Sequence, residues 1–182
     1  SPSRGLGDVY KRQKKNLVLI GMMGSGKSTI GKIIAIKLKL DFIDIDYEIE
    51  KKERKTIRDI FENNGENYFR RIEQNIIFEN LKFRGKVISL GGGAFLNNST
   101  KKKILKDTVS FWLNWDNSTI IKRVGRSYKR PKLDNLSRKD LYYMIKERSK
   151  SYKDANYKIN CENLTKIEIS KKIISIYENS QN

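Results

Sequence analysis

The segment VLIGMMGSGKSTIG, Val18–Gly31, constrains the fold of this chain more than any other stretch. The apolar run Leu17–Ile20 has the length of a buried strand and leads into a loop with three glycines, after which a helical pattern begins. Glycines in such a loop let the backbone wrap closely around phosphate oxygens, and the amides that open the next helix point toward the same oxygens. The sequence therefore predicts a strand–loop–helix unit that binds the phosphates of a nucleoside triphosphate.

The loop also specifies individual roles. Its letters GMMGSGKS satisfy the pattern G-x-x-x-x-G-K-[ST], in which the lysine contacts the terminal phosphates and the hydroxyl binds Mg²⁺. The pattern also arises by chance in unrelated chains, but here it follows an expected strand and opens an expected helix, as binding requires. We expect the nucleotide to be held by Gly24, Ser25, Gly26, Lys27, Ser28 and Thr29.

Short apolar runs alternate with helix-length amphipathic segments along the rest of the chain. The expected strands are Leu17–Ile20, Phe42–Asp44, Val87–Leu90, Val109–Leu113 and Tyr157–Asn160. Helix starts are indicated by capping-box spacings at Thr56 with Asp59, Ser137 with Asp140 and Thr165 with Glu168. This alternation predicts one α/β domain over residues 14–182, with a mostly parallel sheet covered by helices on both faces.

Composition limits the chemistry. The 182 residues include no histidine and a single cysteine, Cys161, so catalysis must use carboxylates, lysine, arginine and bound ions, and we expect Cys161 to be a packing residue. The net charge of +18 fits either a nucleic-acid or anionic-substrate partner, or simply the lysine-rich usage of an AT-rich genome. Residues 1–13 resemble translated adapter sequence, and we expect them to be a non-native leader.

Three further segments point to the second substrate. Asp44 and Asp46 are two apart at a strand end, so we expect both carboxylates to point the same way beside the phosphate loop; solvated turn acids are the alternative. On a helix, Arg70 and Glu73 lie one turn apart and could brace each other, or form an ordinary exposed ion pair. The triplet Gly91–Gly93 ends a buried strand and leaves bare backbone for a ligand.

Taken in order, these motifs resemble those of shikimate kinases. The phosphate loop, the D-x-D pair, G-E-x-x-F-R-x-x-E from Gly65 to Glu73, the glycine triplet and the pair Arg130–Pro131 all recur in that family. The resemblance implies a three-layer P-loop kinase fold with a five-stranded parallel sheet, a substrate-binding region near residues 45–80 and a mobile lid near residues 126–138. It also implies transfer of the γ-phosphoryl group of ATP to the 3-hydroxyl of shikimate with Mg²⁺, a step toward chorismate and the aromatic amino acids.

The resemblance assigns roles position by position. Lys27, Asp46 and Arg130 are the expected catalytic residues, Arg123 the residue that stacks on adenine, and Ser28 and Asp44 the Mg²⁺ residues. The expected shikimate contacts are Asp46, Phe61, Phe69, Arg70, Gly91, Gly92, Gly93 and Arg148. Arginine rather than lysine at both carboxylate contacts suits a bidentate guanidinium fork. Lys150 and Ser151 stand where the family usually has proline and leucine.

The implied protein is a cytoplasmic monomer that binds shikimate and neither nucleic acid nor membrane. Two other readings stay open. A gluconate kinase-like enzyme would share the phosphate loop, although the Gly65–Glu73 signature is not expected in it. A nucleic-acid-binding ATPase would explain the charge and would show hydrolysis that nucleic acid stimulates.

Overall fold

A computed structural model describes residues 2–125 and 136–181, with side chains from residue 5 onward. Five strands are formed: β1 (Asn16–Ile20), β2 (Asp41–Asp44), β3 (Lys86–Ser89), β4 (Thr108–Asn114) and β5 (Tyr157–Asn160). Each expected strand is present, within one residue of its predicted bounds at either end. The signal was strongest for β1, β3 and β4, which are short apolar runs buried on both faces, whereas β2 and β5 are partly exposed.

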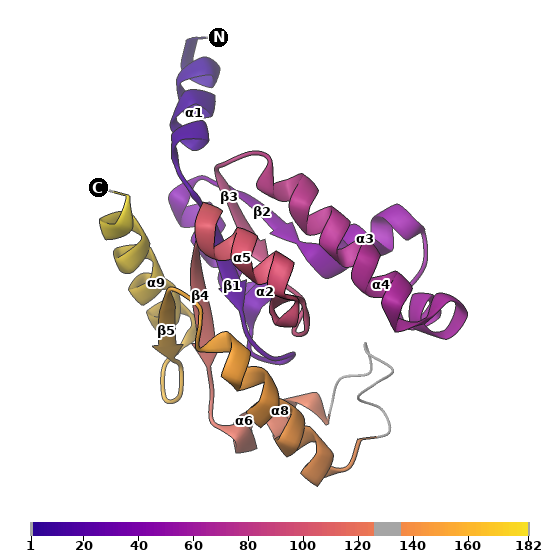
Figure 1. Cartoon of the computed structure of the whole chain (residues 1–182). Coiled ribbons are helices and arrows are strands. Elements are labelled where there is room, and N and C mark those ends of the chain that lie inside the picture. The colour runs from indigo at the N-terminus through magenta and orange to yellow at the C-terminus, as the bar shows by residue number, and fades with distance from the viewer. Residues whose placement is uncertain (1, 126–135, 182) are drawn as a thin grey trace.

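The strands form one parallel sheet in the order β2-β3-β1-β4-β5 (Figure 1). Side chains alternate across it, so Leu17 and Leu19 pack with Ile34 of α2 and Ile169 of α9 on one face. Val18 and Ile20, which alternate with them along β1, pack on the other face with residues of α4, α5 and α8. The expected three-layer arrangement is thus confirmed, and both layers of helices seal the sheet from water.

The helices account for most of the remaining chain. They are α1 (Pro2–Gln13), α2 (Lys27–Leu38), α3 (Ile45–Glu53), α4 (Ile57–Leu81), α5 (Asn98–Asp107), α6 (Asn117–Val124), α8 (Arg138–Tyr152) and α9 (Lys166–Ser180), with a 3₁₀ turn, η1, at Ala94–Leu96. The three predicted caps are present, because the Thr56, Ser137 and Thr165 side chains each accept a bond from the amide three residues on. In the part of the chain that the structure describes, no helix is long and apolar enough to cross a membrane.

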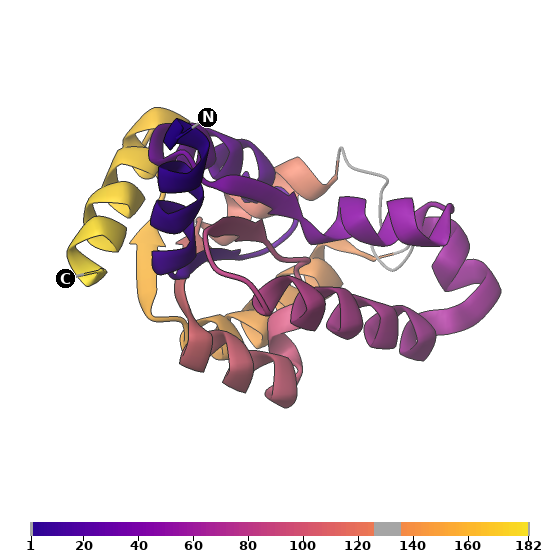
Figure 2. The ribbon, with the colours of Figure 1, turned by 90° about the horizontal axis from the view of Figure 1, so that it is seen from above.

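Helix α4 bends at Gly65, whose φ of 82° and ψ of 172° interrupt the helical backbone. A positive φ of this kind is available to glycine with little strain. The bend separates an outer segment from the segment that carries Phe69 and Arg70, and Figure 2 shows α3 with this outer part of α4 extending away from the sheet. The region expected to bind substrate, residues 45–80, comprises α3 and nearly all of α4.

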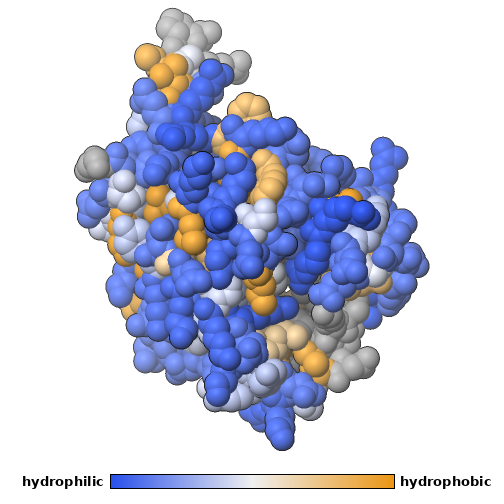
Figure 3. Space-filling view, viewed as in Figure 1, coloured by the Kyte–Doolittle hydropathy of each residue, from blue (hydrophilic) through white to orange (hydrophobic). Residues whose placement is uncertain are grey.

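The first residues form helix α1, which projects from the sheet in Figure 1. Its described side chains are mostly exposed, and none of them belongs to either core cluster. Its last turn meets the body where the Lys11 ammonium lies 3.1 Å from the Asp41 carboxylate. The face shown in Figure 3 is mostly hydrophilic, with apolar side chains in small separate groups, in keeping with the high charge of the chain.

Candidate active site

The carboxyl ends of β1 and β3 bring two glycine-rich loops together. The strands are neighbours, and the Leu90 amide donates to the Leu19 carbonyl at 3.2 Å where both chains leave the sheet. A cleft of about 980 Å³ opens over the two loops. Its lining includes Lys27, Ser28, Thr29, Asp44, Asp46, Gly91 and Gly92. Ligands of doubly wound sheets bind at this edge, so the cleft is the candidate active site.

The phosphate loop closes around its lysine. Gly24 and Gly26 have φ values of 82° and 87°, and the turn they permit carries the chain into α2. The Lys27 ammonium is buried and donates to the carbonyls of Gly21 at 2.6 Å and Met22 at 2.9 Å. The ammonium therefore stays inside the loop, beside the amides of the first turn of α2, where phosphate oxygens are attracted by both.

A hydroxyl and a carboxylate meet next to this loop. The Ser28 hydroxyl donates to Oδ2 of Asp44 at 2.6 Å, while Oδ1 of Asp44 accepts from the Tyr47 amide at 3.3 Å. Two hard oxygen donors beside a phosphate site fit Mg²⁺, which is usually held by few protein groups together with phosphates and water. Among residues 2–125 and 136–181, no cluster of three or more acidic, cysteine or histidine side chains could hold a metal by itself.

The two aspartates reach the cleft by a different route from the one expected. Strand β2 ends at Asp44, which caps α3, and Asp46 lies in the first turn of that helix. The strand spacing on which the expectation was based is therefore wrong for Asp46, which belongs to α3. Both side chains nevertheless line the cleft, because the helix starts at its edge.

Two arginines distant in sequence converge over the glycine triplet. A Cβ atom on Gly92 would lie 2.9 Å from Nη1 of Arg148, and one on Gly93 would lie 2.8 Å from Cζ of Arg70. A side chain at either glycine would therefore push a guanidinium away. Because the two guanidinium groups lie against consecutive glycines, α4 and α8 each place a cation beside the glycine triplet.

Arg70 is held in place by carboxylates of its own helix. Its Nη1 donates to Oε1 of Glu73 at 2.7 Å, and its Nε lies 3.7 Å from Oε1 of Glu66. The Glu73 side chain is only 3% exposed, so this is not the ordinary surface ion pair that the sequence left open. Phe69 is fully buried, and its ring packs 4.6 Å from that of the half-buried Phe61. Of these two rings, Phe61 alone presents surface toward solvent.

Sequence reasoning missed Tyr152, which is buried at the end of α8. Its hydroxyl donates to the Gly92 carbonyl, and the neighbouring Ser151 hydroxyl donates to the Phe95 carbonyl at 3.0 Å. The two bonds fix the glycine loop to the helix that carries Arg148. Lys150 and Ser151, which depart from the family pattern, lie within α8, which ends at Tyr152.

Arg123 lies at the rim of the phosphate loop. Its Nη1 donates to the Gly24 carbonyl at 3.0 Å, and its guanidinium lies 4.0 Å from the ring centroid of Trp115. The Trp115 indole in turn donates to the Ser25 carbonyl at 2.9 Å. Trp115 was also missed, and its position directly after the carboxyl end of β4 is the one signal that could have indicated it.

Two remaining expectations concern Cys161 and the lid. Cys161 is fully buried, and burial raises the pKa of its thiol to about 12, in keeping with a packing residue. Arg130 and most of the expected lid, residues 126–138, lie outside the described residues.

The cleft is lined by the phosphate loop and by Gly91 and Gly92, and two arginines lie against the glycine triplet beside it. This arrangement is that of a P-loop phosphotransferase with a small anionic acceptor. The family model described as shikimate kinase matches residues 23–178. A shikimate kinase of Sulfurihydrogenibium sp. is 42% identical over 163 residues, which cover 88% of this chain and 96% of that protein. The chain therefore belongs to the shikimate kinase family.

Solved structures agree with this assignment. A shikimate kinase from Acinetobacter baumannii in complex with shikimate superposes with a TM-score of 0.85 at 26% identity, covering 95% of this chain and 98% of that one. A gluconokinase from Sinorhizobium meliloti 1021 gives a TM-score of 0.61 at 18% identity over 93% of this chain and 95% of that one. The second likeness extends only to the fold.

Proposed function

We propose that this chain transfers the γ-phosphoryl group of ATP to the 3-hydroxyl group of shikimate, with shikimate 3-phosphate and ADP as products. The convergence of Arg70 and Arg148 over Gly92 and Gly93, beside the phosphate loop, carries this proposal. Planar guanidinium forks suit the two oxygens of a carboxylate, and shikimate carries one on its ring, two carbons from the 3-hydroxyl. Family membership and the shikimate bound to the Acinetobacter baumannii relative support the same choice.

On the nucleotide side, the amides of the phosphate loop and the Lys27 ammonium would hold the β- and γ-phosphates. Ser28 and Asp44 would bind Mg²⁺, either directly or through water. When bound, Mg²⁺ supplies positive charge that offsets the charge of the phosphate oxygens. Arg123, at the rim, would lie against the adenine ring.

On the acceptor side, Asp46 would accept a hydrogen bond from a shikimate hydroxyl and take up the proton as phosphoryl transfer proceeds. In support, Asp46 lies in the first turn of α3 and lines the same cleft as Lys27, Gly91 and Gly92. Phosphoryl transfer depends on positioning and charge neutralisation more than on covalent catalysis, so a chain without histidine lacks nothing that the reaction needs. Arg130, outside the described residues, would add a cation on the phosphate side.

The same proposal covers the partners. We expect a cytoplasmic monomer whose ligands are small molecules, with no nucleic-acid or membrane partner. The charge of +18 then serves to attract an anionic nucleotide and an anionic acceptor, and it predicts that kcat/KM falls as salt increases.

The test is an ADP-release assay with ATP, Mg²⁺ and one of three additives. Shikimate should stimulate release strongly, whereas gluconate and single-stranded DNA should leave it at background. Stimulation by gluconate alone would indicate a kinase for a different acid, and stimulation by DNA alone would indicate a nucleic-acid-dependent ATPase.

A further inference from the structure

We propose that Trp115 is a positioning residue for the nucleotide, which couples Arg123 on the base side to the backbone of the phosphate loop. The inference rests on the proposed function in that a nucleotide must occupy the cleft with its base against Arg123. Trp115 acts through its two neighbours.

The first contact is with the phosphate loop itself. The indole Nε1 of Trp115 donates to the Ser25 carbonyl at 2.9 Å, between the two glycines of positive φ. The Ser25 amide donates to the Met22 carbonyl at 3.1 Å, so both backbone polar groups of Ser25 are hydrogen-bonded. The indole therefore limits movement of the loop at Ser25, between Gly24 and Gly26.

The second contact is with Arg123. The guanidinium lies over the Trp115 ring, 4.0 Å from the centroid, and its Nη1 also donates to the Gly24 carbonyl at 3.0 Å. A Cβ atom on Gly24 would lie 3.1 Å from Cβ of Arg123, so close packing of the arginine requires glycine there. Ring and carbonyl together hold a long, exposed side chain in one orientation, with the other guanidinium face toward solvent.

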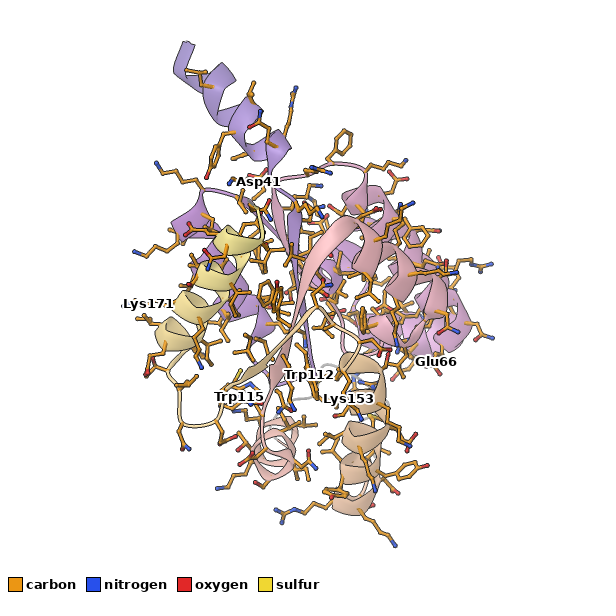
Figure 4. The ribbon with its side chains drawn as sticks, turned by 60° about the vertical axis from the view of Figure 1, so that its left-hand side comes forward. Asp41, Glu66, Trp112, Trp115, Lys153 and Lys171 are labelled. Atoms are coloured by element: carbon orange, nitrogen blue, oxygen red, sulfur yellow. The ribbon has the colours of Figure 1, made fainter. Side chains whose placement is uncertain are left out.

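Trp115 is itself firmly anchored. It directly follows β4, as Figure 4 shows, and packs against both core clusters, one on each face of the sheet. The helix that carries Arg123, α6, is fixed at its start because Glu162 accepts from the Asp116 amide at 3.0 Å and from the Thr119 hydroxyl at 2.9 Å. A rigid ring beneath Arg123 lowers the entropy lost when a nucleobase stacks on the outer face of the guanidinium.

Kinetics provide the first test. Trp115→Leu removes both contacts and should raise KM for ATP about tenfold, whereas Trp115→Phe keeps the ring, loses the indole N–H and should raise it about threefold. KM for shikimate should stay within about twofold of wild type in both variants, because the acceptor pocket lies over the other loop. Trp112→Phe, the matched change within β4, should leave both KM values unaltered.

Fluorescence provides the second test, since Trp112 and Trp115 are the two tryptophans of the chain. In Trp112→Phe, ADP alone should change the emission of Trp115 in a saturable way, while Trp115→Phe should show no such change. The proposal is overturned if Trp115→Leu keeps the wild-type KM for ATP, or if the emission of Trp112→Phe does not respond to ADP.

These experiments distinguish failure of the proposed function from failure of the proposed role of Trp115. Wild-type protein that binds ADP and gives the emission change but does not phosphorylate shikimate would overturn the proposed function and support the role of Trp115. Wild-type protein that does not bind ADP at all would overturn both.

Discussion

Replacing Arg70 with lysine separates the geometry of the carboxylate contact from its charge. Lysine keeps the cation but loses the planar fork and the fixed approach to Glu73 at 2.7 Å. Losing one partner of a buried charge pair typically costs roughly 2–5 kcal/mol. The Arg70 side chain is 26% exposed and the charge is retained, so the lower end applies. We expect a loss of about 2 kcal/mol in shikimate binding, or about 30-fold in affinity.

The assay is calorimetric titration of shikimate and of ADP into wild-type and variant protein. Arg70→Lys should weaken shikimate binding and leave ADP binding within about twofold of wild type. Arg71→Lys is the matched control, because Arg71 is the next residue of α4 and is exposed, with its guanidinium over the Tyr68 ring. Shikimate affinity within about threefold of wild type in Arg70→Lys, or an equal loss of ADP affinity, would refute the reasoning.

Three other changes test separate parts of the account. Lys27→Ala should keep the wild-type melting temperature and lose nearly all phosphoryl transfer, because the cation on the terminal phosphates is gone; substantial turnover would contradict the phosphate-loop assignment. Deleting residues 1–13 should leave activity unchanged and lower the free energy of unfolding by at most about 1 kcal/mol, the value of the half-exposed Lys11–Asp41 pair; loss of several degrees in thermal melting would show that α1 supports the domain. At pH 8 the Cys161 thiol, with its pKa raised to about 12 by burial, should resist alkylation in native protein and react readily in denaturant; rapid native alkylation would place the thiol at the surface.

The strands and their layers could be predicted because the pattern is local. A central parallel strand such as β1, buried on both faces, is a short apolar run, and helical segments separate the five strands along the chain. The caps at Thr56, Ser137 and Thr165 are equally local, since each depends on a side chain and an amide three residues apart.

The local structure around Asp44 and Asp46 was mispredicted because the strand ends at Asp44 and a helix begins directly after it. Strand spacing would put both carboxylates on one side, but Asp44 is the last residue of β2 and the N-cap of α3. Aspartate is a preferred N-cap residue, so the sequence also allowed a helix start at Asp44. The bend of α4 at Gly65 was not predicted from the sequence either.

The contacts of Trp115 and Tyr152 could not have been predicted from spacing. Trp115 bonds to a loop 90 residues earlier, and Tyr152 to a carbonyl 60 residues earlier, so both depend on how β4 and α8 pack in the finished fold. The convergence of Arg70 and Arg148 has the same origin, and the family resemblance alone anticipated it.

The carboxylate contact is the centre of the account, and one ratio tests it most directly. This is kcat/KM for shikimate divided by kcat/KM for the analogue whose carboxylate is reduced to an alcohol. The account predicts a ratio of at least about 30 for wild-type enzyme, falling to within about threefold of unity in the double variant Arg70→Lys with Arg148→Ala. A wild-type ratio near one, or a large ratio that survives in the double variant, would show that these arginines do not bind the acceptor carboxylate.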